Sequence, residues 1–288
     1  MKIYMDGVLV DKEKAVVSVY DHGLLYGDGV FEGIRTYDSL VFRLKEHIDR
    51  LYRSADAIEL KIPLNKTEMM EAVIMTLKAN SLKDGYIRLV VTRGPGDLGL
   101  DPRKCKKATL FIIADKIALY PKEFYQKGLA IVTSTIKRNL PQALDPRIKS
   151  LNYLNNILAK IDAIKSGTNE AIMLTHDNYV AECTGDNIFA VKGGELLTPP
   201  VSVGALEGIT RDAVIDLAKD MDIPFYEKML RMDDLYSADE VFLTGTAAEI
   251  IPVITIDERK IDGGKPGEVT LRLIEAFKKL TKIDGVKY

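Results

Sequence analysis

The residue with the clearest potential for covalent chemistry is Lys149, in the stretch Lys149-Ser150-Leu151-Asn152-Tyr153. The residues that follow predict a helix whose apolar face is buried in a core, because one helix face collects Leu154, Ile157, Leu158 and Ile161. An amine held at the edge of such a core loses solvation, and a lowered pKa suits it to Schiff-base chemistry. A lysine at a helix start ordinarily extends its amine into solvent and has no chemical role. Lys149 is a candidate only because other segments of the chain supply the further residues that a Schiff-base site needs.

A glycine-rich segment leads into a predicted strand that presents an arginine. Residues 21–35 include four glycines, but their spacing is not a dinucleotide fingerprint, and a strand follows instead of a helix. If residues 30–37 are extended, alternate side chains share one face, namely Phe31, Gly33, Arg35 and Tyr37. These side chains could line a pocket or form an exposed edge, and the segment by itself favours neither.

Arg50 lies in a predicted helix over residues 44–57. It shares the polar face with His47 and Ser54, and a lone arginine on such a face is ordinarily solvated. The next helix opens with Asn65 and Glu68, a plausible N-cap and N3 pair.

Arg88 lies in a predicted strand over residues 86–92 and shares one strand face with Tyr86. A charged side chain in so apolar a strand needs either solvent or an anion. The segment 94–102 that follows is rich in Gly and Pro and is expected to form a long ordered loop.

The chain as a whole fits a globular protein of 288 residues with a net charge of −2, which favours neither nucleic acid nor an anionic membrane. No apolar run approaches the roughly 18 residues of a membrane-spanning helix, and the first residues lack the apolar core of a signal peptide. The cysteines and histidines predict neither a disulfide scaffold nor a metal site, since they are few and scattered: Cys105, Cys183, His22, His47 and His176. A reducing cytoplasm is the expected location.

Strands and helices mix without regular alternation, which predicts the α+β class. Strands are expected over residues 3–10, 15–20, 30–37, 86–92, 108–114, 129–134, 171–175, 179–183, 188–197 (turning at Gly193-Gly194) and 241–246. Helices are expected over residues 44–57, 65–77, from 154 onward, 209–221 and 267–280. The pattern breaks around Pro121, so the predicted division is a small N-terminal α/β domain over 1–116, an interdomain loop over 117–127 and a larger C-terminal domain over 128–288.

Several separated blocks resemble the fold type IV pyridoxal-phosphate enzymes, and within them the branched-chain amino acid aminotransferases. The blocks are Tyr-Gly-Asp-Gly-Val-Phe-Glu-Gly-Ile-Arg (26–35), Tyr-Ile-Arg (86–88), Lys-Ser-Leu-Asn-Tyr-Leu (149–154), residues 182–187, Glu-Gly-Ile-Thr-Arg-Asp (207–212) and Gly-Thr-Ala-Ala-Glu-Ile (245–250). Their common order over nearly the whole chain argues against a chance match. The resemblance implies a two-domain fold with a pseudo-barrel in the larger domain.

The resemblance also implies roles around pyridoxal 5′-phosphate. Lys149 matches the lysine that binds the cofactor covalently and, once released, acts as general acid and base. Glu182 matches the carboxylate that faces the pyridine nitrogen, and Tyr153 matches the residue bonded to the phenolic oxygen. The phosphate would be held at a helix start by Ile209 and Thr210, with help from Arg50 and Thr246, while Leu206 would pack on the ring.

For the substrate, the resemblance implies transfer of an amino group from leucine, isoleucine or valine to 2-oxoglutarate. The turn at Thr246 and Ala247 would hold the α-carboxylate. The side-chain pocket would involve Tyr26, Phe31, Gly33 and Tyr86, with Leu100 and Tyr26 supplied by the second subunit of a homodimer or higher oligomer. Arg88 would receive the second carboxylate of glutamate, and Arg35 is the alternative position for that role.

The chain departs from the family in two places. Ser150-Leu151 replaces a Gly-Gly pair often found in bacterial members, with one residue fewer before the tyrosine. The interdomain loop is short, and its pocket tyrosine is matched to neither Tyr120 nor Tyr125 from the sequence. D-amino acid aminotransferases and aminodeoxychorismate lyase share the scaffold, and a broad transaminase that also accepts D-amino acids is the main alternative. A cofactor-binding protein without turnover would lack Lys149 or Glu182, and both are present.

Overall fold

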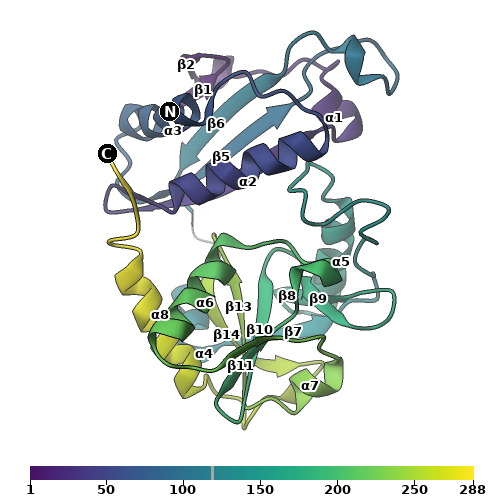
Figure 1. Ribbon diagram of the computed structural model, residues 1–288, viewed down its shortest axis with the longest axis vertical. Coiled ribbons are helices and arrows are strands. Elements are labelled where there is room, and N and C mark those ends of the chain that lie inside the picture. The colour runs from purple at the N-terminus through teal and green to yellow at the C-terminus, as the bar shows by residue number, and fades with distance from the viewer. Residues whose placement is uncertain (118–119) are drawn as a thin grey trace. The chain divides into compact units, whose positions relative to one another are not determined.

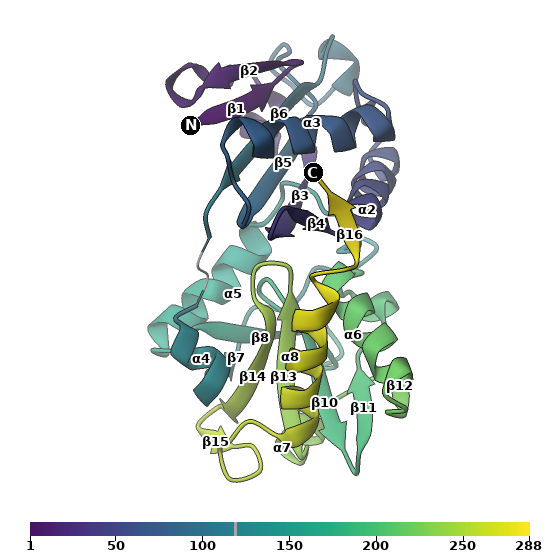
Figure 2. The same cartoon turned by 90° about the vertical axis from the view of Figure 1, so that its left-hand side faces the viewer.

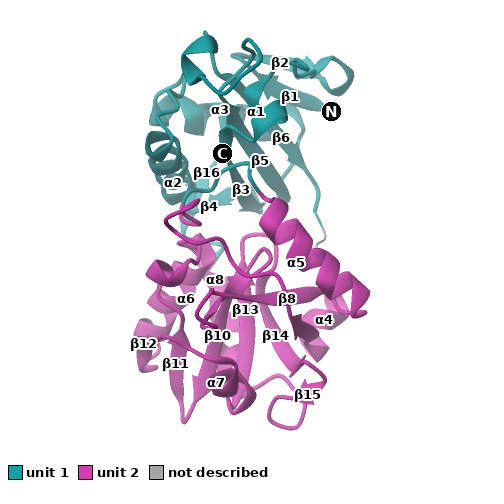
Figure 3. Ribbon diagram, turned by 90° about the vertical axis from the view of Figure 1, so that its right-hand side faces the viewer, with its two compact units in different colours: residues 1–117, 148–152, 281–288 teal, residues 118–147, 153–280 magenta. Residues whose placement is uncertain are grey.

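The computed structural model describes residues 1–117 and 120–288, which form two compact units (Figure 3). Unit 1 comprises Met1–Ile117, Ile148–Asn152 and Thr281–Tyr288, and unit 2 comprises Ala118–Arg147 and Tyr153–Leu280. The segment that carries Lys149 therefore belongs to unit 1, although it lies far along the sequence. The domain limits expected from sequence, 1–116, 117–127 and 128–288, stay a prediction.

Unit 1 is built on a seven-stranded antiparallel sheet. Its strand order is β16 (Gly285–Lys287), β4 (Leu40–Phe42), β3 (Gly29–Tyr37), β5 (Gly85–Thr92), β6 (Thr109–Asp115), β1 (Lys2–Met5) and β2 (Val8–Asp11). Two helices, α2 (Leu44–Ala57) and α3 (Lys66–Ala79), pack beside each other against this sheet (Figure 1). The remaining elements are α1 (His22–Tyr26) and 3₁₀ turns at Lys12–Lys14 and Pro102–Lys104.

Local sequence accounts for how these helices begin. Asn65 accepts a hydrogen bond from the Glu68 N–H, and the Glu68 carboxylate accepts one from the Asn65 N–H, so the predicted capping box is confirmed. Helix α2 covers the predicted range, 44–57, and its apolar side chains join those of β3, β5 and β6 in one core. That core holds the strand face from which Glu32 projects.

Unit 2 is built on a nine-stranded mixed sheet. Its main path is β12 (Phe225–Glu227), β11 (Glu195–Thr198), β10 (Asn187–Lys192), β13 (Glu240–Gly245), β14 (Glu249–Ile256), β7 (Leu129–Thr133), β8 (Glu170–Leu174) and β9 (Val180–Cys183), with β15 (Arg259–Lys260) paired to β14. The pairs β11–β12, β14–β7 and β7–β8 are parallel and the other pairs are antiparallel.

The helices of unit 2 are α4 (Lys122–Lys127), α5 (Leu154–Lys165), α6 (Ile209–Asp220), α7 (Met232–Tyr236) and α8 (Glu268–Leu280), with a 3₁₀ turn at Val201–Val203. Helices α6 and α8 pack against each other and against β13, and α5 packs against β8 (Figure 2). Helix α4 lies inside the range assigned above to the interdomain loop. Together the two units confirm the α+β class.

The structure corrects the elements expected from the sequence in several places. Residues 15–20 form no strand, and residues 3–10 form a two-stranded hairpin that turns at Asp6 and Gly7, both with positive φ. The sequence pattern also does not predict the long strand β14. Pro252 lies within this strand, and a proline in a sequence segment argues against predicting a strand there.

Another correction concerns the apolar face of α5. Leu154, Ile157 and Leu158 are 67%, 52% and 42% exposed, whereas α5 buries the small side chains Ala159 and Ala163 against β8. Helical periodicity identifies a face that repels water, but it does not say what covers that face.

None of the helices within residues 1–117 and 120–288 is long and apolar enough to cross a membrane.

Candidate functional site

Lys149 is fixed by pairing with the start of β3. Its carbonyl accepts a hydrogen bond from the Phe31 N–H at 3.0 Å, its own N–H donates to Ser54 Oγ at 3.1 Å, and Leu151 N–H donates to the Gly29 carbonyl at 2.9 Å. The Lys149 amine lies 4.4 Å from the centre of the Phe31 ring. Lys149 is half-buried. The sheet, and not a buried face of α5, therefore anchors the backbone of the lysine.

The Phe31 face of β3 brings several predicted substrate residues together. Gly33 pairs with Arg88 across to β5, and the Arg88 guanidinium lies 4.6 Å from the Phe31 ring centre and 5.4 Å from that of Tyr86. A Cβ atom on Gly33 would lie 2.0 Å from the Tyr86 hydroxyl oxygen. The missing side chain at Gly33 thus lets the Tyr86 phenol lie over β3, and one cation stands between two aromatic rings.

The opposite face of β3 carries a buried charge cluster. Glu32 accepts hydrogen bonds from Arg50 Nε at 2.7 Å and Arg50 Nη2 at 2.9 Å, and His47 Nδ1 lies 2.8 Å from the same carboxylate. All three side chains are buried, as is Ser54, so the solvated face expected for α2 is wrong. The helix face that carries His47, Arg50 and Ser54 packs against the sheet. The Arg50 guanidinium can be buried there because the Glu32 carboxylate supplies the opposite charge.

The cluster shifts two pKa values. Burial raises the pKa of the Glu32 carboxyl, but the Arg50 guanidinium and the His47 ring outweigh burial and hold that pKa well below its usual range. Burial lowers the pKa of His47, with Arg50 and Lys149 acting in the same direction against the attraction of Glu32. A neutral His47 donates its Nδ1–H to the carboxylate, and its Nε2 atom has no hydrogen-bond partner among the residues that the structure describes.

In unit 2, Glu182 is held by three donors. Arg138 Nη2 lies 2.7 Å from Oε1, while Oε2 accepts from the Leu206 N–H at 2.9 Å and from Asn187 Nδ2 at 3.4 Å. Glu182, Arg138 and Asn187 are each more than nine-tenths buried. All three of these groups donate to the carboxylate, which suits an ionised acceptor with a fixed orientation.

The start of α6 offers backbone donors to an anion. Gly208 is the N-cap and has no side chain to cap the helix, so the first N–H groups, at Ile209 and Thr210, have no capping side chain within the described part of the chain. A Cβ on Gly208 would lie 2.0 Å from Asn187 Oδ1, so glycine is needed where this chain passes Asn187. Thr246 and Ala247 lie in the turn between β13 and β14, as predicted.

The predicted residues divide between the two units. Unit 1 contains Lys149, Arg50, Tyr26, Phe31, Gly33, Arg35, Tyr86, Arg88 and Leu100, whereas unit 2 contains Tyr153, Glu182, Leu206, Ile209, Thr210, Thr246 and Ala247. Arg35 stacks 5.0 Å over the Tyr37 ring. Tyr26 accepts a hydrogen bond from the Gly99 N–H at 2.9 Å, next to Leu100, which is 81% exposed.

The two tyrosines of the predicted interdomain loop both pack against the core of unit 2. Tyr120 is buried and its ring meets Phe124 edge-on, whereas Tyr125 is partly buried. Burial raises the pKa of Tyr120 far above its usual range.

Sequence reasoning missed three side chains that organise the site. Arg138 lies a few residues after a short strand, and the sequence around it has no pattern that predicts a site residue. Glu32 and His47 carried a usable signal: an acid in an apolar strand, and a histidine three residues before Arg50 on one helix face.

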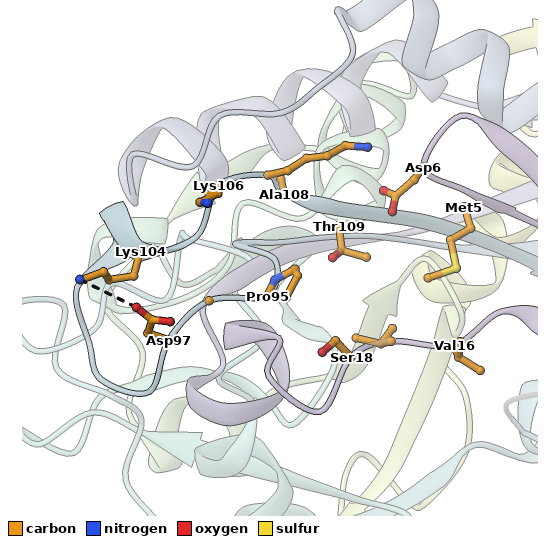
Figure 4. A pocket seen from close by; sticks show the side chains of 13 residues that line it. Met5, Asp6, Val16, Ser18, Pro95, Asp97, Lys104, Lys106, Ala108 and Thr109 are labelled. Carbon is orange, nitrogen blue, oxygen red and sulfur yellow. Dashed lines mark ion pairs between the residues drawn. The ribbon is translucent and has the colours of Figure 1, made fainter.

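Unit 1 also has a surface pocket of about 580 Å³ (Figure 4). Lysines and carboxylates line it, including Lys104 and Asp97, whose charged atoms are 3.9 Å apart. None of the predicted site residues lines this pocket. Within the described part of the chain, no group of three or more His, Cys, Asp or Glu residues could hold a metal ion.

Residues 29–256 match the family model for amino-transferase class IV. The chain is 55% identical, over its full length and 99% of the relative, to a protein of Methanocaldococcus jannaschii assigned to the branched-chain-amino-acid aminotransferases. The crystal structure of branched-chain amino acid aminotransferase from Escherichia coli superposes with a TM-score of 0.95 at 38% identity, covering 97% of this chain and 94% of that one. The branched-chain amino acid aminotransferase from Thermobaculum terrenum, whose crystal structure is of the holo-form with pyridoxal phosphate, gives a TM-score of 0.88 at 31% identity, covering 97% and 93%.

Proposed function

The chain belongs to the amino-transferase class IV family, and within it to the branched-chain amino acid aminotransferases, and on that premise we propose the reaction that it catalyses. It transfers the amino group of leucine, isoleucine or valine to 2-oxoglutarate, giving branched-chain 2-oxo acids and L-glutamate. Pyridoxal phosphate is the cofactor, and when bound it supplies a ring that accepts electrons from the substrate.

The residues present fit this cofactor. The bare start of α6 provides N–H groups of Ile209 and Thr210 for a phosphate, and the helix dipole favours an anion there. Arg50, fixed by Glu32, and Thr246 would add side-chain donors. Tyr153 would bind the phenolic oxygen and Leu206 would pack on the ring.

The observation that carries the proposal is the fixed carboxylate of Glu182. A carboxylate held by Arg138 and the Leu206 N–H cannot turn away, so it can keep a pyridine nitrogen protonated without further reorganisation. Lys149 would bind the cofactor and, once its amine is free, act as the base that takes the proton from the substrate α-carbon.

The Phe31 face supports the choice of substrates. Phe31 and Tyr86 offer apolar surface to a branched side chain, while Arg88 offers a cation to a second carboxylate. A transaminase needs the apolar surface and the cation in one pocket, because its two amino acids occupy that pocket alternately.

The direct test is a half-reaction screen. Purified holoenzyme is mixed separately with L-leucine, L-isoleucine, L-valine, L-glutamate, D-leucine and D-glutamate, and conversion of the cofactor is followed by absorbance. Conversion with the four L-amino acids is expected. Conversion with the D-amino acids at equal rates would favour the broad-specificity alternative, and no conversion with any of them would reject the proposal.

A second experiment tests the role of Lys149. Borohydride reduction of the holoenzyme followed by peptide mass spectrometry should place the cofactor on Lys149. Lys149→Ala should bind pyridoxal phosphate without forming a reducible link. A reduced adduct on another lysine of the wild type would overturn the assignment.

The homo-oligomer is part of the proposal. Tyr26, Leu98 and Leu100 are exposed in unit 1, and the apolar face of α5 is exposed in unit 2. Such surfaces are typical of subunit interfaces. We propose that a second copy covers them and that Tyr26 and Leu100 reach its substrate pocket. A cytoplasmic location also stays a prediction from the sequence.

A further inference from the structure

Asn156 lies in the first turn of α5, three residues after Tyr153, and its side chain is buried. Its Oδ1 accepts a hydrogen bond from Arg138 Nη1 at 2.9 Å. Its Nδ2 donates to the Thr184 carbonyl at 2.8 Å. Both ends of the amide are used, so its orientation is set by the two partners.

Both hydrogen-bond partners of Asn156 are connected to Glu182, one by a direct contact and the other through the backbone. Arg138 contacts the Glu182 carboxylate with a different nitrogen, Nη2, at 2.7 Å. Thr184 lies two residues after Glu182, just past the end of β9. One amide of α5 therefore fixes the ion partner of Glu182 and the backbone that carries it.

A second connection from α5 supports the same backbone. The N–H and the hydroxyl of Thr184 both donate to Glu170 Oε1, and Lys160, one helical turn after Asn156, lies with its amine 3.2 Å from Glu170 Oε2. Glu170 is 2% exposed. The turn after Glu182 is thus held from two successive turns of one helix.

We propose that Asn156 is a positioning residue that keeps Glu182 oriented toward the cofactor ring nitrogen. The inference rests on the proposed function, since it assigns Asn156 a task only where Glu182 serves that nitrogen. Without the amide, the Arg138 guanidinium loses one of its acceptors and the Thr184 carbonyl loses a donor. Small displacements of a catalytic group can cost about a hundredfold in rate, so a loss of roughly ten- to a hundredfold is expected for Asn156→Ala.

The control is Asp162 on the same helix. It accepts hydrogen bonds from Ser134 Oγ at 2.9 Å and the Thr135 N–H at 3.0 Å and contacts none of the groups around Glu182 named above. Asp162→Ala should loosen the packing of α5 much as Asn156→Ala does. Thermal unfolding of both apo proteins measures that shared effect.

The test compares the wild type, Asn156→Ala, Asp162→Ala, Glu182→Gln and the double variant Asn156→Ala/Glu182→Gln as holoenzymes. Two quantities are measured: the rate of a single turnover with L-leucine at saturation, and the pH midpoint of the absorbance change of the bound cofactor. Asn156→Ala should slow turnover roughly ten- to a hundredfold and move the midpoint to higher pH, in the direction of Glu182→Gln, because a less protonated ring withdraws fewer electrons. In the Glu182→Gln background, Asn156→Ala should add less than about threefold, since it acts through Glu182.

Three results would overturn the inference: equal losses for Asn156→Ala and Asp162→Ala, additive losses in the double variant, or an unmoved midpoint. The wild type separates these from failure of the proposed function. A wild type that binds no pyridoxal phosphate, or converts it with no amino acid, rejects that function. If the wild type is active and Asn156→Ala changes neither the turnover rate nor the pH midpoint, only the role of Asn156 is rejected. Where Asn156→Ala does not fold, Asn156→Ser is used; it adds no charge, and its shorter side chain should show the same midpoint shift in smaller degree.

Discussion

At the scale of single residues, the buried carboxylates Glu32 and Glu182 each have a buried cationic partner that holds them in place. Glu32 faces Arg50 and His47 on one sheet, and Glu182 faces Arg138 on the other. Removing one member leaves the other charged and buried, which typically costs several kcal/mol. Substitutions that preserve shape but change charge are therefore the informative ones.

Glu182→Gln tests the carboxylate directly. The amide keeps nearly the same shape but cannot hold a ring nitrogen protonated, so turnover should fall on the order of a thousandfold, about 4 kcal/mol of barrier. Affinity for pyridoxal phosphate, measured by titrating the apo protein, should change far less. Near-normal turnover would show that Glu182 has another task.

Arg88→Leu tests recognition of the second carboxylate. A charge-assisted contact is worth roughly 1.5–3 kcal/mol, so the ratio of kcat/KM for L-glutamate to that for L-leucine should drop about ten- to a hundredfold. Leucine needs only the apolar surface of Phe31 and Tyr86 and should be affected less. Equal losses for both substrates would make Arg88 structural and direct attention to Arg35.

His47 predicts a pH dependence of stability. Its pKa is lowered in the folded protein by burial, with Arg50 and Lys149 adding to the effect and Glu32 opposing it, so the unfolded chain takes up a proton at a higher pH than the folded one. Unfolding is therefore increasingly favoured as pH falls below about 6.5, at no more than about 1.4 kcal/mol per pH unit, until the folded-state pKa is passed.

His47→Asn isolates this contribution, since asparagine can still donate to Glu32 but does not titrate. The free energy of urea unfolding of the apo protein, compared between wild type and variant at about pH 7.5 and about pH 5.5, should show a smaller wild-type advantage at the lower pH. A constant difference would mean that His47 does not titrate in this range. Titration of Glu32 lies outside the range, because its pKa is lowered.

At the scale of elements, the cross-strand register of β3 and β5 determines what the Phe31 face can hold. Gly33 lies opposite Arg88 and beneath the Tyr86 phenol, so a short stretch of two strands sets both the apolar and the charged part of the surface. Strand pairing fixes such neighbours more firmly than loops do.

Gly33→Ala should displace Tyr86, because the new Cβ would lie 2.0 Å from the phenol oxygen and 2.8 Å from Cζ. Overpacking of this kind costs about 1–3 kcal/mol of unfolding free energy. In a Tyr86→Ala background the same substitution should cost much less, as measured by urea unfolding of the four proteins in the cycle. Equal costs in both backgrounds would show that the contact with Tyr86 is not the cause.

At the scale of the whole molecule, the exposed apolar face of α5 favours an oligomer. In the proposed homo-oligomer, Ile157→Glu combined with Leu158→Glu should shift light-scattering mass from oligomer toward monomer and raise the dissociation constant at least about tenfold. Leu271→Glu on α8 is the matched control, since Leu271 is also exposed, at 43%, but lies outside this face. An unchanged mass in the α5 variant would place the interface elsewhere, and an active wild-type monomer would contradict the oligomer itself.

The sequence by itself determined the elements whose causes are local. The capping box at Asn65 and Glu68, helix α2 over 44–57, the strand faces of Phe31 and Arg88 and the helix start after Gly208 follow from periodicity and backbone chemistry within a few residues. The ordered blocks around Lys149 and Glu182 likewise pointed to the family. Their roles at the cofactor stay predictions.

Tertiary structure alone decided the features that depend on residues distant in sequence. Arg50 is buried because Glu32 lies opposite it, Lys149 is anchored by pairing with β3, and Arg138 reaches Glu182 from 44 positions earlier in the chain. The apolar face of α5 is exposed because α5 turns its small residues to β8. A charge or an apolar face in a sequence shows a need for a partner, but only the folded chain determines which partner satisfies it.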